Sequence, residues 1–132
     1  MKKRINVVGA VLIRGEMVLA AQRSSAMSLP GMWEFPGGKI ERSESPKEAL
    51  LRELKEELLC DAEIGEHVAT TEHEYDFGFV ILTTYYCSLT GEEPRLTEHS
   101  EIRWVLVSEL DQLNWAPADI PAVEQVMRDF QV

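Results

Sequence analysis

The sequence has few cysteines and no long apolar segment, and each shortage excludes a class of protein. Only two of the 132 residues are cysteines, Cys60 and Cys87, and neither belongs to a CxxC pair. This count excludes a disulfide-rich secreted scaffold, and we expect both thiols to be buried in a cytoplasmic protein. No segment approaches the roughly 20 apolar residues that a membrane-spanning helix needs, so we expect no membrane partner.

Basic residues are also scarce. The 13 Lys and Arg residues stand against 23 Asp and Glu residues, which gives a net charge of −10. This charge argues against nonspecific binding to a nucleic-acid polymer or an anionic membrane, although an acidic protein still binds a polyphosphate where cations bridge the two. With 45% hydrophobic residues, the chain is expected to form one globular domain over residues 1–132. No sequence feature identifies a protein partner.

The distribution of apolar, Gly and Pro residues predicts the secondary structure. The predicted strands are residues 5–14, 17–23, 62–75, 79–89 and 102–107, with turns at 15–16 and 76–78. Trp33-Glu34-Phe35 is predicted to be a short extended segment, closed by a turn at Pro36-Gly37-Gly38. One helix is expected after Ser45 and another after Asp119. This order indicates an α/β fold, with a mixed sheet and helices packed on its faces.

The helix after Ser45 has the clearest signals. Ser45 is followed by Pro46 and Glu48, the residues of a capping box with proline at the first helical position. An apolar stripe is expected to face the core, and its predicted members are Leu51, Leu54 and Leu58.

Three carboxylates share an adjacent arc of this helix. The i, i+3, i+4 spacing of Glu53, Glu56 and Glu57 places them together. Their repulsion costs roughly 0.2–0.5 kcal/mol for each neighbouring pair, and a divalent metal ion would neutralise it. Gly37-Gly38 allows close approach of the backbone, and this region offers only the oxygen ligands that Mg²⁺ and Mn²⁺ prefer. Taken alone, the trio is more typical of a solvated acidic helix face.

The charged residues around the trio make a more specific pattern. Arg52 can pair with Glu44 or Glu48 and so hold the preceding loop against the helix. Gly38, Glu44 and the run Arg52-Glu53-Leu54-Lys55-Glu56-Glu57 resemble the Nudix box, here residues 38–60. That box is the signature of hydrolases of nucleoside diphosphates linked to another moiety.

Two positions depart from the box. Leu59 stands where the box has the Gly of a left-handed helix cap, and Cys60 replaces an aliphatic residue. A Leu in the left-handed conformation costs roughly 1–2 kcal/mol unless the turn changes. The departure therefore concerns the helix exit and leaves every charged position of the box in place.

The resemblance extends beyond the box. Residues 33–41 resemble the MutT branch of the Nudix family, and residues 116–121 resemble its CTP pyrophosphohydrolase relatives. This implies a Nudix α/β/α sandwich with a central mixed β-sheet. It also implies a Mg²⁺-dependent enzyme, with Mn²⁺ as an alternative ion, in which water attacks a nucleoside triphosphate to give the monophosphate and pyrophosphate. The implied substrates are oxidised, modified or cytidine-type nucleotides, as in nucleotide-pool sanitation.

The same resemblance assigns expected roles to individual residues. The implied metal ligands are the Gly37 carbonyl, Glu53, Glu56, Glu57 and Glu98. The implied catalytic residues are Glu53, Glu98, Glu44 and Arg52, with Glu53 the first choice and Glu98 the second choice for the general base. The implied substrate-binding residues are Arg23, Phe35, Gly38, Lys39 and Asp119.

Four of the substrate-binding residues have structural alternatives. Arg23 can form a surface ion pair instead, Phe35 can belong to the core, and Lys39 can be solvated. MutT has Asn where this chain has Asp119. An ionised Asp only accepts hydrogen bonds, which favours an exocyclic amino group such as cytosine N4, and it can also cap the last helix.

Two other functions stay open. One is a Nudix hydrolase of a nucleotide sugar or dinucleotide. The other is a non-catalytic nucleotide-binding module, against which the intact charged positions of the box argue.

Overall fold

Seven strands pair into a mixed sheet around a long first strand. The computed structural model describes residues 2–131. Its strands are β1 (Arg4–Arg14), β2 (Met17–Gln22), β3 (Trp33–Glu34), β4 (Gly37–Lys39), β5 (Ala62–Tyr75), β6 (Gly78–Leu89) and β7 (Glu101–Leu106). The helices are α1 (Pro46–Leu58) and α2 (Ile120–Asp129), with 3₁₀ helices at Val107–Gln112 and Pro117–Asp119. The five strands predicted from the sequence are confirmed to within one residue at each end.

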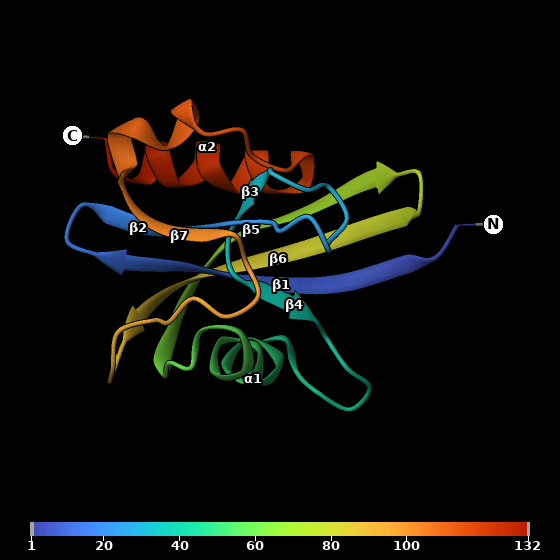
Figure 1. The fold of residues 1–132 in the computed structure, drawn as a ribbon, viewed down its shortest axis with the longest axis horizontal. Coiled ribbons are helices and arrows are strands. Elements are labelled where there is room, and N and C mark those ends of the chain that lie inside the picture. The colour runs from blue at the N-terminus through green and yellow to red at the C-terminus, as the bar shows by residue number, and fades with distance from the viewer. Residues whose placement is uncertain (1, 132) are drawn as a thin grey trace.

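The sheet order is β3-β2-β1-β6-β5, with β4 also paired to β1 and β7 to β2. β1 runs parallel to β6, whereas the other pairs are antiparallel. Helix α1 lies on one side of the strands and α2 on the other (Figure 1). The predicted α/β/α sandwich with a mixed central sheet is therefore confirmed. Within residues 2–131, neither helix has the length and apolarity needed to cross a bilayer.

A separate apolar core lies beneath each helix. The α2 core includes Val11, Phe35 and Val126, and the α1 core includes Val8, Leu12 and Leu54. Both cysteines are unpaired and buried, and they belong to the α1 core, as the sequence predicted. The two cores fix both helices against one sheet.

Helix α1 begins with the predicted capping box. Ser45 Oγ accepts from the Glu48 backbone N–H at 3.1 Å, and Glu48 Oε1 accepts from the Ser45 N–H at 2.8 Å. The predicted core stripe was partly wrong, because Leu51 is 44% exposed while Leu50 is fully buried. Leu50 is separated from Leu54 by one helical turn and shares its face, whereas Leu51 points about 100° away.

The helix ends at Leu59 in the left-handed conformation that the Nudix box normally gives to Gly. Leu59 has φ 53° and ψ 37°, and its N–H bonds the carbonyls of Leu54 and Lys55. The side chain is 47% exposed, so little core packing depends on it. The left-handed turn is therefore kept at Leu59, with the conformational cost that a residue other than Gly has there.

The glycine pair after Pro36 forms a strand and not the predicted turn. Gly37 and Gly38 pair with Gly9 and Val8 of β1. A Cβ atom on Gly37 would collide with the Val8 carbonyl, so this close pairing requires glycine. The pairing places the loop before α1 at the middle of the sheet.

Candidate active site

The α1 carboxylates meet the glycine pair of β4. The Gly37 N–H donates to Glu57 Oε1 at 3.2 Å. A Cβ atom on Gly38 would collide with the Glu53 carboxylate, so the missing side chain makes room for that group. Glu53 and Glu57 are half-buried between helix and sheet, while Glu56 is exposed. The structure thus brings together two of the three helix carboxylates with Gly37 and Gly38.

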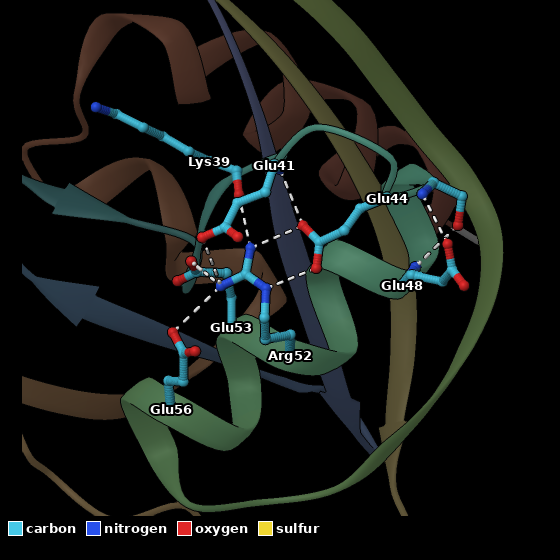
Figure 2. Close-up of polar contacts among 8 residues, drawn as sticks. Lys39, Glu41, Glu44, Glu48, Arg52, Glu53 and Glu56 are labelled. Atoms are coloured by element: carbon cyan, nitrogen blue, oxygen red, sulfur yellow. Dashed lines mark hydrogen bonds and ion pairs between the residues drawn. The ribbon is translucent and has the colours of Figure 1, made fainter.

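Arg52 organises the loop that precedes the helix (Figure 2). Its Nε donates to Glu44 Oε2 at 2.6 Å and its Nη2 to Glu44 Oε1 at 2.9 Å. Nη2 also donates to the Lys39 carbonyl at 3.0 Å, which ties β4 to the helix. The Arg52 hydrogen bond holds the pKa of Glu44 at about 2, well below its usual range. Arg52 pairs with Glu44 and not with Glu48, the other predicted partner, because Glu48 is engaged in the capping box.

Arg52 also bonds the carboxylates of the trio. Nη1 donates to Glu53 at 2.9 Å and to Glu56 at 3.2 Å. Among residues 2–131, no three carboxylate, His or Cys side chains stand close enough together to hold one metal ion. The donor set consists of oxygens, which fits a hard divalent cation.

Burial perturbs the ionisation of two carboxyl groups. It raises the pKa of Glu57 to about 8, and the nearby Glu34 and Glu53 charges add to this. Burial also raises the pKa of Glu53, although the Arg52 hydrogen bond opposes the change. A nearby positive charge lowers the pKa of a buried carboxyl group, so a cation at this position would stabilise the ionised forms of Glu53 and Glu57.

A cavity of about 430 Å³ opens beside these carboxylates. Its lining includes seven residues predicted for the site: Arg23, Phe35, Gly37, Gly38, Lys39, Glu57 and Asp119. Its size lies within the usual range for small-molecule sites. Lys39 is exposed, and Glu53, Glu56, Arg52 and Glu98 do not line the cavity.

Asp119 is buried in the cavity wall and does not cap α2 with its side chain. Its Oδ2 accepts from the Phe35 N–H at 3.0 Å, and the predicted capping bond is absent. Burial raises the pKa of Asp119 well above its ordinary value. Phe35 is only 3% exposed and packs against Trp115, with ring centroids 4.7 Å apart. It therefore contributes to the core as well as to the cavity wall.

Arg23 belongs to a buried charged cluster that the sequence did not reveal. Its Nη1 donates to Glu34 Oε1 at 2.6 Å, while His99 Nε2 lies 2.8 Å from Glu34 Oε2. The Glu34 carboxylate is thus held from both sides, and Glu34 lines the cavity. No spacing signal predicts this cluster, since Glu34 and His99 are 65 positions apart. The one sequence feature that points to Glu34 is its charge between the aromatic residues Trp33 and Phe35.

Glu98 lies in the exposed loop before β7. Within residues 2–131, its carboxylate has no hydrogen bond or ion pair. The neighbouring Thr97 donates to the Glu57 carbonyl at the end of α1, and His99 contacts Glu34. Glu98 therefore lies between a residue bound to the carboxylate helix and a residue bound to the cavity wall.

Comparison with known proteins identifies the family. The NUDIX domain model matches residues 3–126. A CTP pyrophosphohydrolase of Escherichia coli is 38% identical over 95% of this chain and 93% of its own length. A putative 8-oxo-dGTP diphosphatase 2 of Mycobacterium tuberculosis is 40% identical over 86% of this chain and 81% of its own length.

A solved structure of the same family is also similar to this chain. The MutT protein of methicillin-resistant Staphylococcus aureus, a Nudix hydrolase, is 60% identical, covers 98% of this chain and 99% of its own, and superposes with a TM-score of 0.81. The chain belongs to the NUDIX family. It is an enzyme that hydrolyses phosphoanhydride bonds, and members of this family generally require a divalent metal ion.

Proposed function

We propose that this protein is a Mg²⁺-dependent nucleoside triphosphate pyrophosphohydrolase that acts on modified, oxidised or cytidine-type nucleotides. The observation that carries the proposal is the shared cavity. Its lining includes Gly37, Gly38 and Glu57 together with Arg23 and Asp119. A triphosphate near Glu57 and a base near Asp119 would together make one nucleotide-sized ligand. The substrates named for the E. coli and M. tuberculosis relatives support the same class.

The proposed metal-holding groups are the Gly37 carbonyl, Glu53, Glu56, Glu57 and Glu98. A bound Mg²⁺ would offset phosphate charge and favour attack by water at phosphorus. Glu53 is proposed as the general base, with Glu98 the second candidate. Arg52 and Glu44 would hold Glu53 and the β4 loop in place, and Lys39 would contact the phosphates.

Base selection is proposed to depend on Asp119, Arg23 and Phe35. An ionised Asp119 would accept from cytosine N4, whereas a protonated Asp119 would both donate and accept, which also suits an oxidised guanine. Both substrate types therefore stay within the proposal. The proposed compartment is the cytoplasm, which the two unpaired, buried cysteines support.

The test is a substrate screen with Mg²⁺ in which pyrophosphate and phosphate are measured separately. It should include CTP, dCTP, 5-methyl-dCTP and 8-oxo-dGTP, with ADP-ribose and diadenosine polyphosphates representing the alternative substrates. We expect the wild type to release pyrophosphate from at least one triphosphate. In Glu53→Gln we expect the rate of this release to fall by a factor of about 100 or more. Glu66→Gln, on the exposed face of β5, is the control that should leave the rate unchanged. Unchanged pyrophosphate release by Glu53→Gln from every triphosphate would contradict the catalytic assignment.

Asp119→Asn tests the base-binding end. Asn keeps an oxygen for the Phe35 N–H, but its amide nitrogen only donates. We therefore expect the ratio of kcat/KM for CTP to that for 8-oxo-dGTP to fall. An unchanged ratio would show that residue 119 does not contribute to base selection.

A further inference from the structure

The loop that carries Glu98 is anchored at two separate places. On one side, the Arg95 N–H donates to the Leu58 carbonyl at 2.8 Å, and the Thr97 hydroxyl donates to the Glu57 carbonyl. Both acceptors lie at the end of α1. On the other side, the Ser100 N–H donates to the Gln22 carbonyl of β2 at 2.9 Å. Glu98 lies between these anchors, so the loop spans from the carboxylate helix to the end of β2, next to Arg23 of the cavity lining.

His99 is the buried residue of this loop. Its side chain is fully buried, and its Nε2 lies 2.8 Å from Glu34 Oε2. Because Arg23 donates to the other Glu34 oxygen, the Glu34 carboxylate lies between the guanidinium and the imidazole. Nδ1 has no hydrogen-bond partner among the described residues. A buried ring nitrogen without a partner costs free energy, so core stability alone does not explain a histidine here.

We propose that His99 is a positioning residue that connects Glu34 in the cavity to Glu98, so that occupation of the cavity by the correct base sets the Glu98 carboxylate for catalysis. This inference rests on the proposed function. Within the part of the chain that the structure describes, the Glu98 side chain has no hydrogen bond or ion pair, and one peptide bond joins Glu98 to His99. A displacement of Glu34 when a base binds passes through the 2.8 Å contact to the imidazole, and from there to the Glu98 backbone.

The arrangement makes a specific kinetic prediction. A base that engages Glu34 properly would orient Glu98, and selectivity would then appear in kcat as well as in KM. A base that binds without engaging Glu34 would leave Glu98 in solvent. His99 would thus contribute to discrimination between nucleotides without touching the substrate.

The first experiment compares His99→Leu with His99→Gln, using the best triphosphate from the screen and its poorest competitor. Leu fills the buried volume but removes the donor, while Gln retains an N–H within reach of Glu34. We expect His99→Leu to lower kcat for the best substrate by about 10- to 100-fold, with a smaller change for the competitor, and His99→Gln to recover most of the loss. His67→Leu, on the exposed β5 strand, is the control. Equal losses for both nucleotides, or a change in KM alone, would overturn the proposal.

A double-mutant cycle with Glu98→Gln tests the connection itself. If His99 acts through Glu98, the His99→Leu change should lower kcat by less than about twofold once Glu98 is gone. A full additional loss in the Glu98→Gln background, or wild-type activity of Glu98→Gln alone, would refute it. Circular dichroism and thermal unfolding of each variant show whether the fold is retained.

A readout that does not require turnover completes the test. Titration of CMP into ¹⁵N-labelled protein already saturated with Mg²⁺ should shift the Glu98 backbone amide resonance in the wild type and in His99→Gln, and leave it unshifted in His99→Leu. A shift in His99→Leu equal to that of the wild type would overturn the proposal. A wild-type protein that hydrolyses a triphosphate but shows no effect of residue 99 refutes this inference alone. A wild-type protein that releases no pyrophosphate from any triphosphate refutes the proposed function.

Discussion

Glu57 offers a direct test of how the folded protein treats the carboxylates of α1. Its side chain is half-buried and accepts one backbone hydrogen bond, from Gly37 at 3.2 Å. Burial raises the pKa of Glu57 from 4.5 to about 8. Glu57→Gln keeps the shape of the side chain and an oxygen for the Gly37 N–H, but it removes the ionisation. The comparison of the two proteins therefore isolates the cost of the charge.

The sign and size of the effect follow from proton linkage. Because the folded-state pKa lies above the unfolded value, the contribution of Glu57 to stability is most favourable below pH 4.5 and is lost as the pH rises toward about 8. Each pKa unit corresponds to about 1.4 kcal/mol, so the difference between the folded-state and unfolded pKa sets an upper bound of about 5 kcal/mol on the loss of stability. Water reaching a half-buried group reduces the cost, so we expect about 2–4 kcal/mol.

The assay is urea unfolding of both proteins at pH values from 5 to 9 in the presence of EDTA. The free energy of unfolding of the wild type, relative to Glu57→Gln, should fall across this range by the stated amount. Titrating groups far from Glu57 are common to both proteins and cancel in the difference. Glu56→Gln, at the exposed neighbouring position, should show no such trend. Adding Mg²⁺ at pH 8 should stabilise the wild type more than Glu57→Gln.

Parallel pH curves for the wild type and Glu57→Gln would refute the reasoning, since they would mean that ionisation of Glu57 costs the folded protein nothing. A wild type that gained stability relative to the variant as the pH rose, without metal, would show that the sign is wrong. Equal stabilisation of both proteins by Mg²⁺ would remove Glu57 from the proposed metal ligands.

Two further predictions concern Arg52 and the end of α1. Arg52→Lys keeps the charge but loses the planar fork that bonds both Glu44 oxygens, so we expect about 2–3 kcal/mol of destabilisation and a loss of about tenfold or more in pyrophosphate release. The control is Arg42→Lys at an exposed position, and an Arg52→Lys protein with wild-type stability and rate would contradict the assigned role. At Leu59, the left-handed conformation should make the Gly variant more stable than the Ala variant by about 1 kcal/mol in urea unfolding. At the exposed helical position Lys55 the order should reverse, and the same order at both sites would show that residue 59 carries no conformational cost.

The sequence alone predicted the features that depend on neighbours along the chain. The capping box at Ser45 and Glu48 formed as expected, because its partners lie within one helical turn. The common arc of Glu53, Glu56 and Glu57 follows from helix periodicity and needs no tertiary information. The strand boundaries and the sandwich architecture were also predictable, because alternating apolar residues and the Nudix box are local patterns.

The tertiary structure decided what those local patterns left open. Gly37 and Gly38 form a strand because they pair with β1, which lies so close to Gly37 that no side chain fits there. Sequence spacing carries no information about that approach. Asp119 bonds the Phe35 N–H, 84 positions away, instead of capping its own helix. Glu34 gained His99 as a partner only because β3 and the loop before β7 meet at the cavity. Contacts of this kind depend on how distant segments pack, so the carboxylate arc of α1 could be predicted from local sequence, while the lining of the cavity beside it could not.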